Sequence, residues 1–171
     1  EYQTRGWQRM VSIDRIVPAM LGKTLVALEL ALIGMAVYYV AAAITGLLLG
    51  FNPADPTGPG ILLPWGLCGA LGAWAIGTVT MMLATWFRTF AALSAAGLGA
   101  IIIGMVLTSV VPSLASGYPF TLITFGMGAR AASQEEAFTS PITMIGTAIV
   151  CLIWVVLSVV VTISRIRRRE W

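Results

Sequence analysis

Residues that could carry chemistry are few and dispersed in this chain of 171 residues. It contains no histidine, seven acidic residues and two cysteines, Cys68 and Cys151, which both lie in long apolar stretches. Metal sites and catalytic triads need clustered histidine, thiol or carboxylate side chains. We therefore expect no catalytic residues, no metal ligands and no cofactor in this chain, and we interpret the two cysteines as small apolar side chains.

Glu29 is the one acidic residue inside an apolar stretch, and it follows Lys23 by about 9 Å along a helix. A carboxyl group within a membrane span usually faces the bundle interior or water, so Glu29 is a functional candidate. Alternatively the span begins late, and Glu29 lies at the membrane rim beside Lys23 or a basic loop residue. Tyr38 and Tyr39, further along the same stretch, would either donate hydrogen bonds in a cavity or pack against a neighbouring helix.

The opening segment, residues 1–23, is the one long polar stretch before the apolar sequence begins. On a helix of 3.6 residues per turn, its apolar side would carry Trp7, Met10, Val11, Ile13 and Val17. Its basic and polar side would carry Arg5, Gln8, Arg9, Ser12 and Arg15. Such a helix either lies at the lipid–water interface or offers a surface to a cytoplasmic partner. Pro18 is expected to end it.

The composition predicts an integral membrane protein, because 58% of the residues are hydrophobic and 10% are charged, whereas soluble domains carry about 25% charged residues. Apolar stretches long enough to cross a bilayer are Leu21–Leu49, Ile61–Trp86, Phe90–Val111 and Ile142–Ile163. We therefore expect an all-α membrane protein with four transmembrane helices. We expect a cytoplasmic amphipathic helix (1–18), a first span (19–50) and an external loop (51–60). Two spans (61–87 and 88–111), an external or re-entrant element (112–140), a fourth span (141–164) and a basic tail (165–171) would follow.

The basic residues predict the orientation of these spans. If the spans alternate in direction, nine of the ten basic residues fall on one side of the membrane. The other side carries only Arg130, together with Asp55, Glu135 and Glu136. Cytoplasmic loops are enriched in lysine and arginine, so we expect both ends of the chain in the cytoplasm.

The stretch 112–140 is unusual for an external loop. It contains GYPFTLITFGMGA, which is too apolar for a solvated loop and too short to span the membrane. A re-entrant or interfacial helical element fits this composition; an ordinary packed loop is the alternative. Small residues spaced four apart within the spans permit close helix approach: Gly46/Gly50, Gly66/Ala70 and Ala100/Gly104.

The opening segment resembles the cytoplasmic helix of ABC transporter permeases of the type-2 export class. The resemblance rests on Glu1, Gly6-Trp7, Met10-Val11, Asp14-Arg15 and Lys23, which stand in the order of that family's pattern. The threonine of the family's pair is absent, and Pro18 follows the arginine instead of preceding it. The four spans, the apolar external element and the basic tail look like the C-terminal two-thirds of a six-helix permease. Within the class, the subgroup of bacteriocin and bacitracin immunity or drug efflux is the most similar.

The resemblance implies a permease subunit in a bacterial plasma membrane that exports a peptide antibiotic, a drug or a lipid-like molecule. It further implies pairing with a second permease subunit and with separate ATP-binding subunits that hold ATP and Mg²⁺, and it implies no nucleic-acid partner. The ATPase would contact Arg5, Trp7, Arg9, Met10 and Arg15. Lys23 and Glu29 would transmit its movement, and Tyr118, Phe120 and Phe125 would gate the outer exit. Two spans would precede Glu1. The alternative is a tetraspan scaffold or assembly protein that transports nothing.

Overall fold

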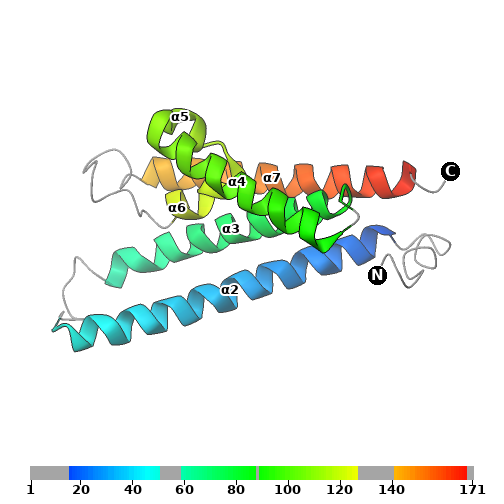
Figure 1. Ribbon diagram of the computed structural model, residues 1–171. Coiled ribbons are helices and arrows are strands. Elements are labelled where there is room, and N and C mark those ends of the chain that lie inside the picture. Colours follow the sequence, from blue (N-terminus) through cyan, green and yellow to red (C-terminus); the bar gives the residue numbers. More distant parts are fainter. Residues whose placement is uncertain (1–15, 51–58, 88, 127–140, 169–171) are drawn as a thin grey trace.

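The computed structural model describes residues 16–50, 59–87, 89–126 and 141–168. Four long helices dominate it, namely α2 (Ile16–Leu48), α3 (Pro59–Ala84), α4 (Phe90–Val110) and α7 (Pro141–Arg168) (Figure 1). Each is long and apolar enough to cross a membrane, and no strand occurs in the described ranges. The expected all-α membrane protein with four spans is confirmed.

Two expected helix ends differ from the structure. Pro18 does not end a helix, because α2 begins at Ile16 and contains Pro18 in its first turn. The backbone N–H groups of a first turn have no partner inside the helix, so a proline there removes no hydrogen bond. Helix α7 runs on to Arg168, so Arg165 and Arg167 belong to the helix instead of a separate tail. The expected amphipathic helix up to residue 15, the loop 51–58 and residues 127–140 lie outside the described residues.

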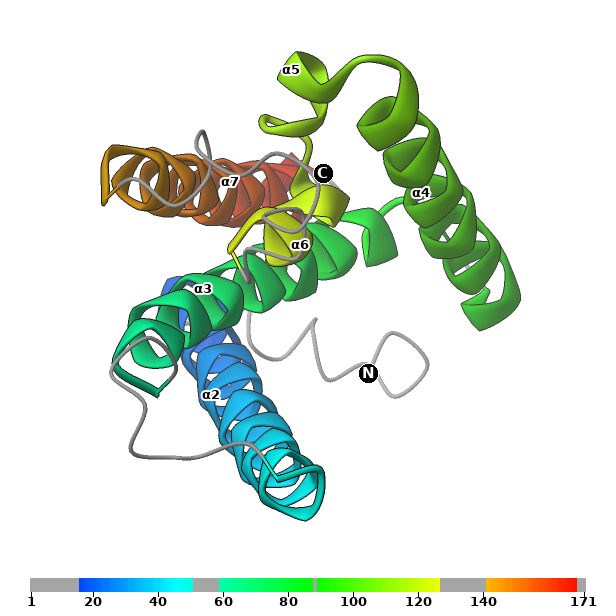
Figure 2. The same ribbon diagram turned by 90° about the vertical axis from the view of Figure 1, so that its left-hand side faces the viewer.

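Helix α3 is the central element of the fold. Of its apolar window Gly66–Ala84, 39% is buried, compared with 17% for α7 and 6% for α2 and α4. Figure 2 shows α3 in the middle, with α2, α7 and α4 around it. The outer helices leave large apolar side chains such as Leu25, Ile102 and Val156 exposed. Water would not tolerate such a surface, whereas lipid does.

Helices α2 and α3 run antiparallel to one another. The indole Nε1 of Trp74 donates a hydrogen bond to the carbonyl oxygen of Thr24 at 2.8 Å. Nearer the other end of α2, the ring of Tyr39 lies so close to Gly66 that a Cβ there would collide with the ring. Residue numbers therefore rise along α2 as they fall along α3, as expected for neighbouring helices joined by one short connection. Tyr39 uses its ring for packing.

Helices α3 and α7 run parallel. The thiol of Cys68 donates to the carbonyl oxygen of Met144 at 3.8 Å. Further along both helices, Ala75 and Cys151 share a buried cluster with Leu122 and Val155. Cys68 and Met144 are as far apart in the sequence as Ala75 and Cys151. The two helices therefore keep the same register over this length. Cys151 is fully buried in this cluster, as an apolar packing residue would be.

A compact segment, residues 112–126, connects α4 back to the centre of the molecule. It consists of α5 (Pro112–Ala115), the 3₁₀ turn η2 (Pro119–Thr121) and α6 (Leu122–Gly126). It lies toward the end of the molecule opposite to the start of α2 and the end of α7 (Figure 1). Leu122 reaches the buried cluster that Ala75 of α3 forms with Cys151 and Val155 of α7. The segment therefore folds back into the helix bundle instead of lying across its end.

Candidate functional site

The segment 112–126 is held at its turn by hydrogen bonds to two different helices. The indole Nε1 of Trp154 on α7 donates to the carbonyl oxygen of Gly117 at 2.9 Å. The hydroxyl of Tyr118 donates to the carbonyl oxygen of Ala100 on α4 at 3.0 Å. Backbone outside a regular helix leaves polar groups that lipid cannot satisfy, so such bonds are needed at membrane depth. Neighbouring residues of the turn thus connect to α7 and α4.

Glycine lets this segment approach α3 closely. A Cβ at Gly72 would lie 2.7 Å from both the backbone N and the Cα of Ile123. A Cβ at Gly126 would lie 2.7 Å from the carbonyl oxygen of Cys68. Backbone atoms cannot move aside as the end of a side chain can. The contact between α6 and α3 therefore requires glycine on both sides.

The three residues expected to gate an exit lie in this segment. The rings of Tyr118 and Phe120 are 5.9 Å apart at an interplanar angle of 38°. Phe125 lies on α6 and is buried. The Tyr118 hydroxyl is the donor in the bond to Ala100. The structure thus brings Tyr118 and Phe120 together and places Phe125 on the following helix.

At the opposite end, the first turn of α2 packs against the last turns of α7. Ile16 and Met20 form a buried cluster with Ile166, and Ile163 packs on it. Beside it, the guanidinium carbon of Arg165 lies 4.5 Å from the centre of the Trp86 ring, just after α3 ends. These contacts bring α2, α7 and the end of α3 together at one end of the molecule.

The contact between Arg165 and Trp86 was missed by sequence reasoning. The guanidinium Nε of Arg165 is buried and has no hydrogen-bond partner within the part of the chain that the structure describes. Stacking on an indole ring is favourable for a guanidinium in such a place. The available signal was the alternation of the spans, because the stretches that end near Trp86 and Arg165 are expected to run in the same direction and so to end on the same side.

Lys23 and Glu29, the expected transmission residues, lie on different faces of α2. Lys23 is half-buried and lines a groove beside Met81 of α3, whereas Glu29 is exposed. Lys23 lies across from Met81, and Ala27 lies across from Gly77, so Glu29 is level with Ala75. Glu29 therefore does not face the interior of the described part of this bundle, and it lies about 9 Å along α2 from Lys23. Its side chain is on the outer surface, level with Ala75 of α3.

The expected ATPase-docking residues lie outside the described residues: Arg5, Trp7, Arg9, Met10 and Arg15. Within the described ranges, no three His, Cys, Asp or Glu side chains stand close enough together to hold a metal ion. The arrangement is one of packed helices and close backbone contacts.

The fold defines the class of this protein: an all-α membrane protein with four long apolar helices and a short helical segment folded into the bundle. No family model, no curated protein and no solved structure matches the chain. Function must therefore be argued from the residues and their arrangement.

Proposed function

We propose that this chain is the membrane-spanning permease subunit of an ATP-driven exporter in a bacterial plasma membrane. Its cargo would be a peptide antibiotic, a drug or a lipid-like molecule. It would pair with a second permease subunit, and ATP would be hydrolysed in separate ATP-binding subunits. Both ends of the chain, which carry most of its basic residues, would lie in the cytoplasm.

The observation that carries the proposal is the packing of Ile16 and Met20 against Ile166. Helix α2 begins at Ile16, directly after the basic opening segment in the sequence, and Pro18 lies within its first turn. A force applied to that segment would reach α2 and α7 at the same point. This is the geometry needed by a lever that an ATP-binding subunit moves.

The contacts along α3 support a connection from that lever to the other end of the molecule. Trp74 links α3 to α2 through the carbonyl oxygen of Thr24. Gly72, two residues before Trp74, lies against the backbone of Ile123 in the segment 112–126. Movement of α2 against α3 would therefore reach the segment that holds Tyr118 and Phe120, where we place the outer gate.

Association with an ATP-binding protein tests the proposal directly. The full-length protein would be purified from membranes, and the ATP-binding protein that is retained would be quantified. Trp7→Ala and Arg9→Glu should each lower this amount at least several-fold, because they remove the apolar and the basic part of the docking face. Gln3→Ala, in the same segment, is the matched control. Full association of both variants would overturn the docking surface, and the lack of any ATP-binding partner would favour the tetraspan scaffold.

A transport assay distinguishes the proposed role of Glu29 from that of the docking segment. The variant Glu29→Gln keeps the shape of the side chain and removes its charge, so transport should slow while ATPase association is unchanged. Vesicle uptake of a fluorescent cationic drug or peptide would be measured with and without ATP. A normal rate for Glu29→Gln would remove this residue from the mechanism and leave the rest of the proposal standing.

Labelling with a membrane-impermeant maleimide tests the orientation. In a chain with Cys68 and Cys151 replaced by alanine, Thr89→Cys and Arg167→Cys should react only from the cytoplasmic side. Both positions are exposed at the end where α2 begins. Leu49→Cys, exposed at the far end of α2, should react only from outside. The reverse pattern would contradict the proposed arrangement.

A further inference from the structure

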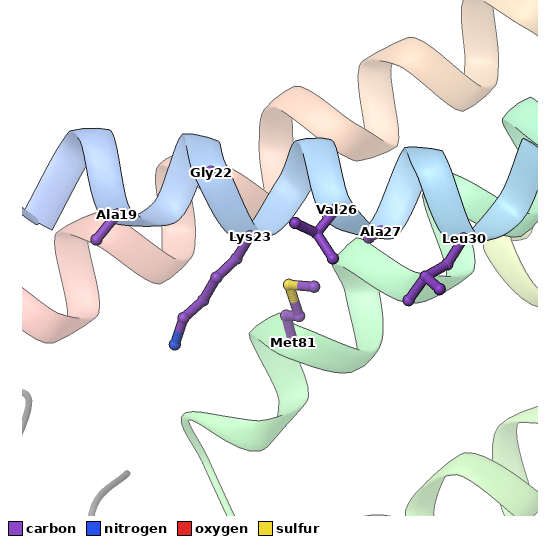
Figure 3. A pocket seen from close by; sticks show the side chains of 7 residues that line it. All are labelled: Ala19, Gly22, Lys23, Val26, Ala27, Leu30 and Met81. Carbon is purple, nitrogen blue, oxygen red and sulfur yellow. The ribbon is translucent and has the colours of Figure 1, made fainter.

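A groove of about 480 Å³ runs along the boundary between α2 and α3. Figure 3 shows its lining, with Lys23 extending from α2 and Met81 standing on α3. Its remaining lining residues are all apolar or glycine: Ala19, Gly22, Val26, Ala27 and Leu30. Among the described residues that line it, Lys23 is thus the one charged residue of an otherwise apolar groove.

Along α2, Lys23 separates a short part of the lining toward the start of the helix, with Ala19 and Gly22, from a deeper part with Val26, Ala27 and Leu30. Lys23 lies across from Met81, three residues before α3 ends at Ala84, so its ammonium group is close to the end of a membrane span. From Lys23 to Leu30 the lining continues for about 10 Å toward the middle of the bundle. A cation therefore marks the headgroup end, and apolar side chains line the deeper part.

We propose that this groove binds an anionic phospholipid, with its phosphate at Lys23 and one acyl chain along Val26, Ala27 and Leu30. Charge complementarity at the headgroup level selects the anionic lipid, because a lysine ammonium is a compact charge that binds phosphate well. Met81 suits an acyl chain, because its flexible thioether side chain adapts to irregular apolar surfaces. The inference does not depend on the proposed exporter function.

Gly22 offers a way to fill the groove without disturbing the helices. A Cβ at this position would meet no atom within 4 Å, although Gly22 lines the groove. The variant Gly22→Leu therefore places a new side chain where we expect the lipid, while Lys23 keeps its charge. It separates the need for an apolar groove from the need for a cation.

Native mass spectrometry of the intact chain would test the site. The protein would be transferred from vesicles of equal phosphatidylglycerol and phosphatidylcholine, and the lipid retained would be counted. We expect one tightly retained phosphatidylglycerol. Lys23→Gln should lower its retention about fivefold, the factor that corresponds to roughly 1 kcal/mol per cation. Gly22→Leu should lower it by a similar factor. Arg167→Gln, which removes an exposed cation from α7 at the same end, should leave it unchanged.

Lys23 is the only lysine of the chain, which allows a second, direct readout. Reductive methylation with ¹³C-formaldehyde would label its side chain, and the Lys23→Gln spectrum identifies the Lys23 signal. Phosphatidylglycerol should shift that signal in a saturable manner, and phosphatidylcholine should not. Equal effects of both lipids, equal losses from Lys23→Gln and Arg167→Gln, or undiminished retention by Gly22→Leu would each overturn the proposal.

Discussion

The indole Nε1 of Trp154 donates a hydrogen bond to the carbonyl oxygen of Gly117, 2.9 Å away, and thereby joins α7 to the segment 112–126. Replacing Trp154 with phenylalanine keeps an aromatic ring and removes the donor. The Gly117 carbonyl would then be unsatisfied, so Trp154→Phe should lower the free energy of unfolding by about 1 kcal/mol. Thermal unfolding in detergent would measure this loss.

A control for that variant is Leu152→Phe, because Leu152 is exposed on the same helix. It introduces a similar ring without touching the hydrogen bond, so its unfolding temperature should stay close to that of the unchanged protein. Equal unfolding temperatures for Trp154→Phe and the unchanged protein would show that the bond does not stabilise the segment.

Gly72 is expected to be intolerant of any side chain. A methyl group there would come within 2.7 Å of the Ile123 backbone, so Gly72→Ala should destabilise the protein by about 1–3 kcal/mol through overpacking. Gly97 and Gly99 on α4 provide matched controls, since a Cβ at either position meets nothing within 4 Å. Alanine at those two positions should be neutral or stabilising. Equal effects at Gly72 and Gly97 in chemical denaturation would refute the close approach of α6 to α3.

Arg165 and Trp86 are expected to be energetically coupled. Their contact at 4.5 Å should appear in a double-mutant cycle of Arg165→Met and Trp86→Leu as a coupling of about 0.5–2 kcal/mol. The lower part of that range is expected, because the Trp86 side chain is 51% exposed. Arg167→Met, paired with Trp86→Leu, should show no coupling. Additive effects in the Arg165 cycle would mean that the two side chains do not stabilise one another.

Ala27 and Gly77 should be close enough to be joined by a disulfide. A Cβ built on Gly77 lies 3.8 Å from the Cβ of Ala27, within the range of Cβ separations in disulfides. In a chain with Cys68 and Cys151 replaced by alanine, Ala27→Cys/Gly77→Cys should cross-link rapidly under mild oxidation. The fraction joined would be measured with a protease site introduced between α2 and α3. Gly22→Cys/Gly77→Cys should react far more slowly, and a reversed order of rates would contradict the packing of α2 on α3.

The length and position of the membrane spans could be predicted from the sequence because each depends on an uninterrupted apolar run. Phe90–Val111 was expected as a span, and α4 covers Phe90–Val110. Thr89 precedes it, and its side-chain oxygen accepts a hydrogen bond from the backbone N–H of Ala92 at 3.3 Å, a local capping signal. An apolar run and a helix cap depend only on residues that are close to one another in the sequence.

The partners of each helix face were decided by the tertiary structure. Gly66 and Gly104 were recognisable as small residues that permit close approach, but their neighbours were not. Gly66 lies under Tyr39, whereas Gly104 lies under Thr121 and Tyr118. Glu29 could be identified as an unusual residue, but its position on the outer surface of α2 could not be predicted. Spans that are apolar on every side carry no stripe to mark the buried face. Since lipid solvates apolar side chains as well as a protein interior does, shape and a few hydrogen bonds select the packing.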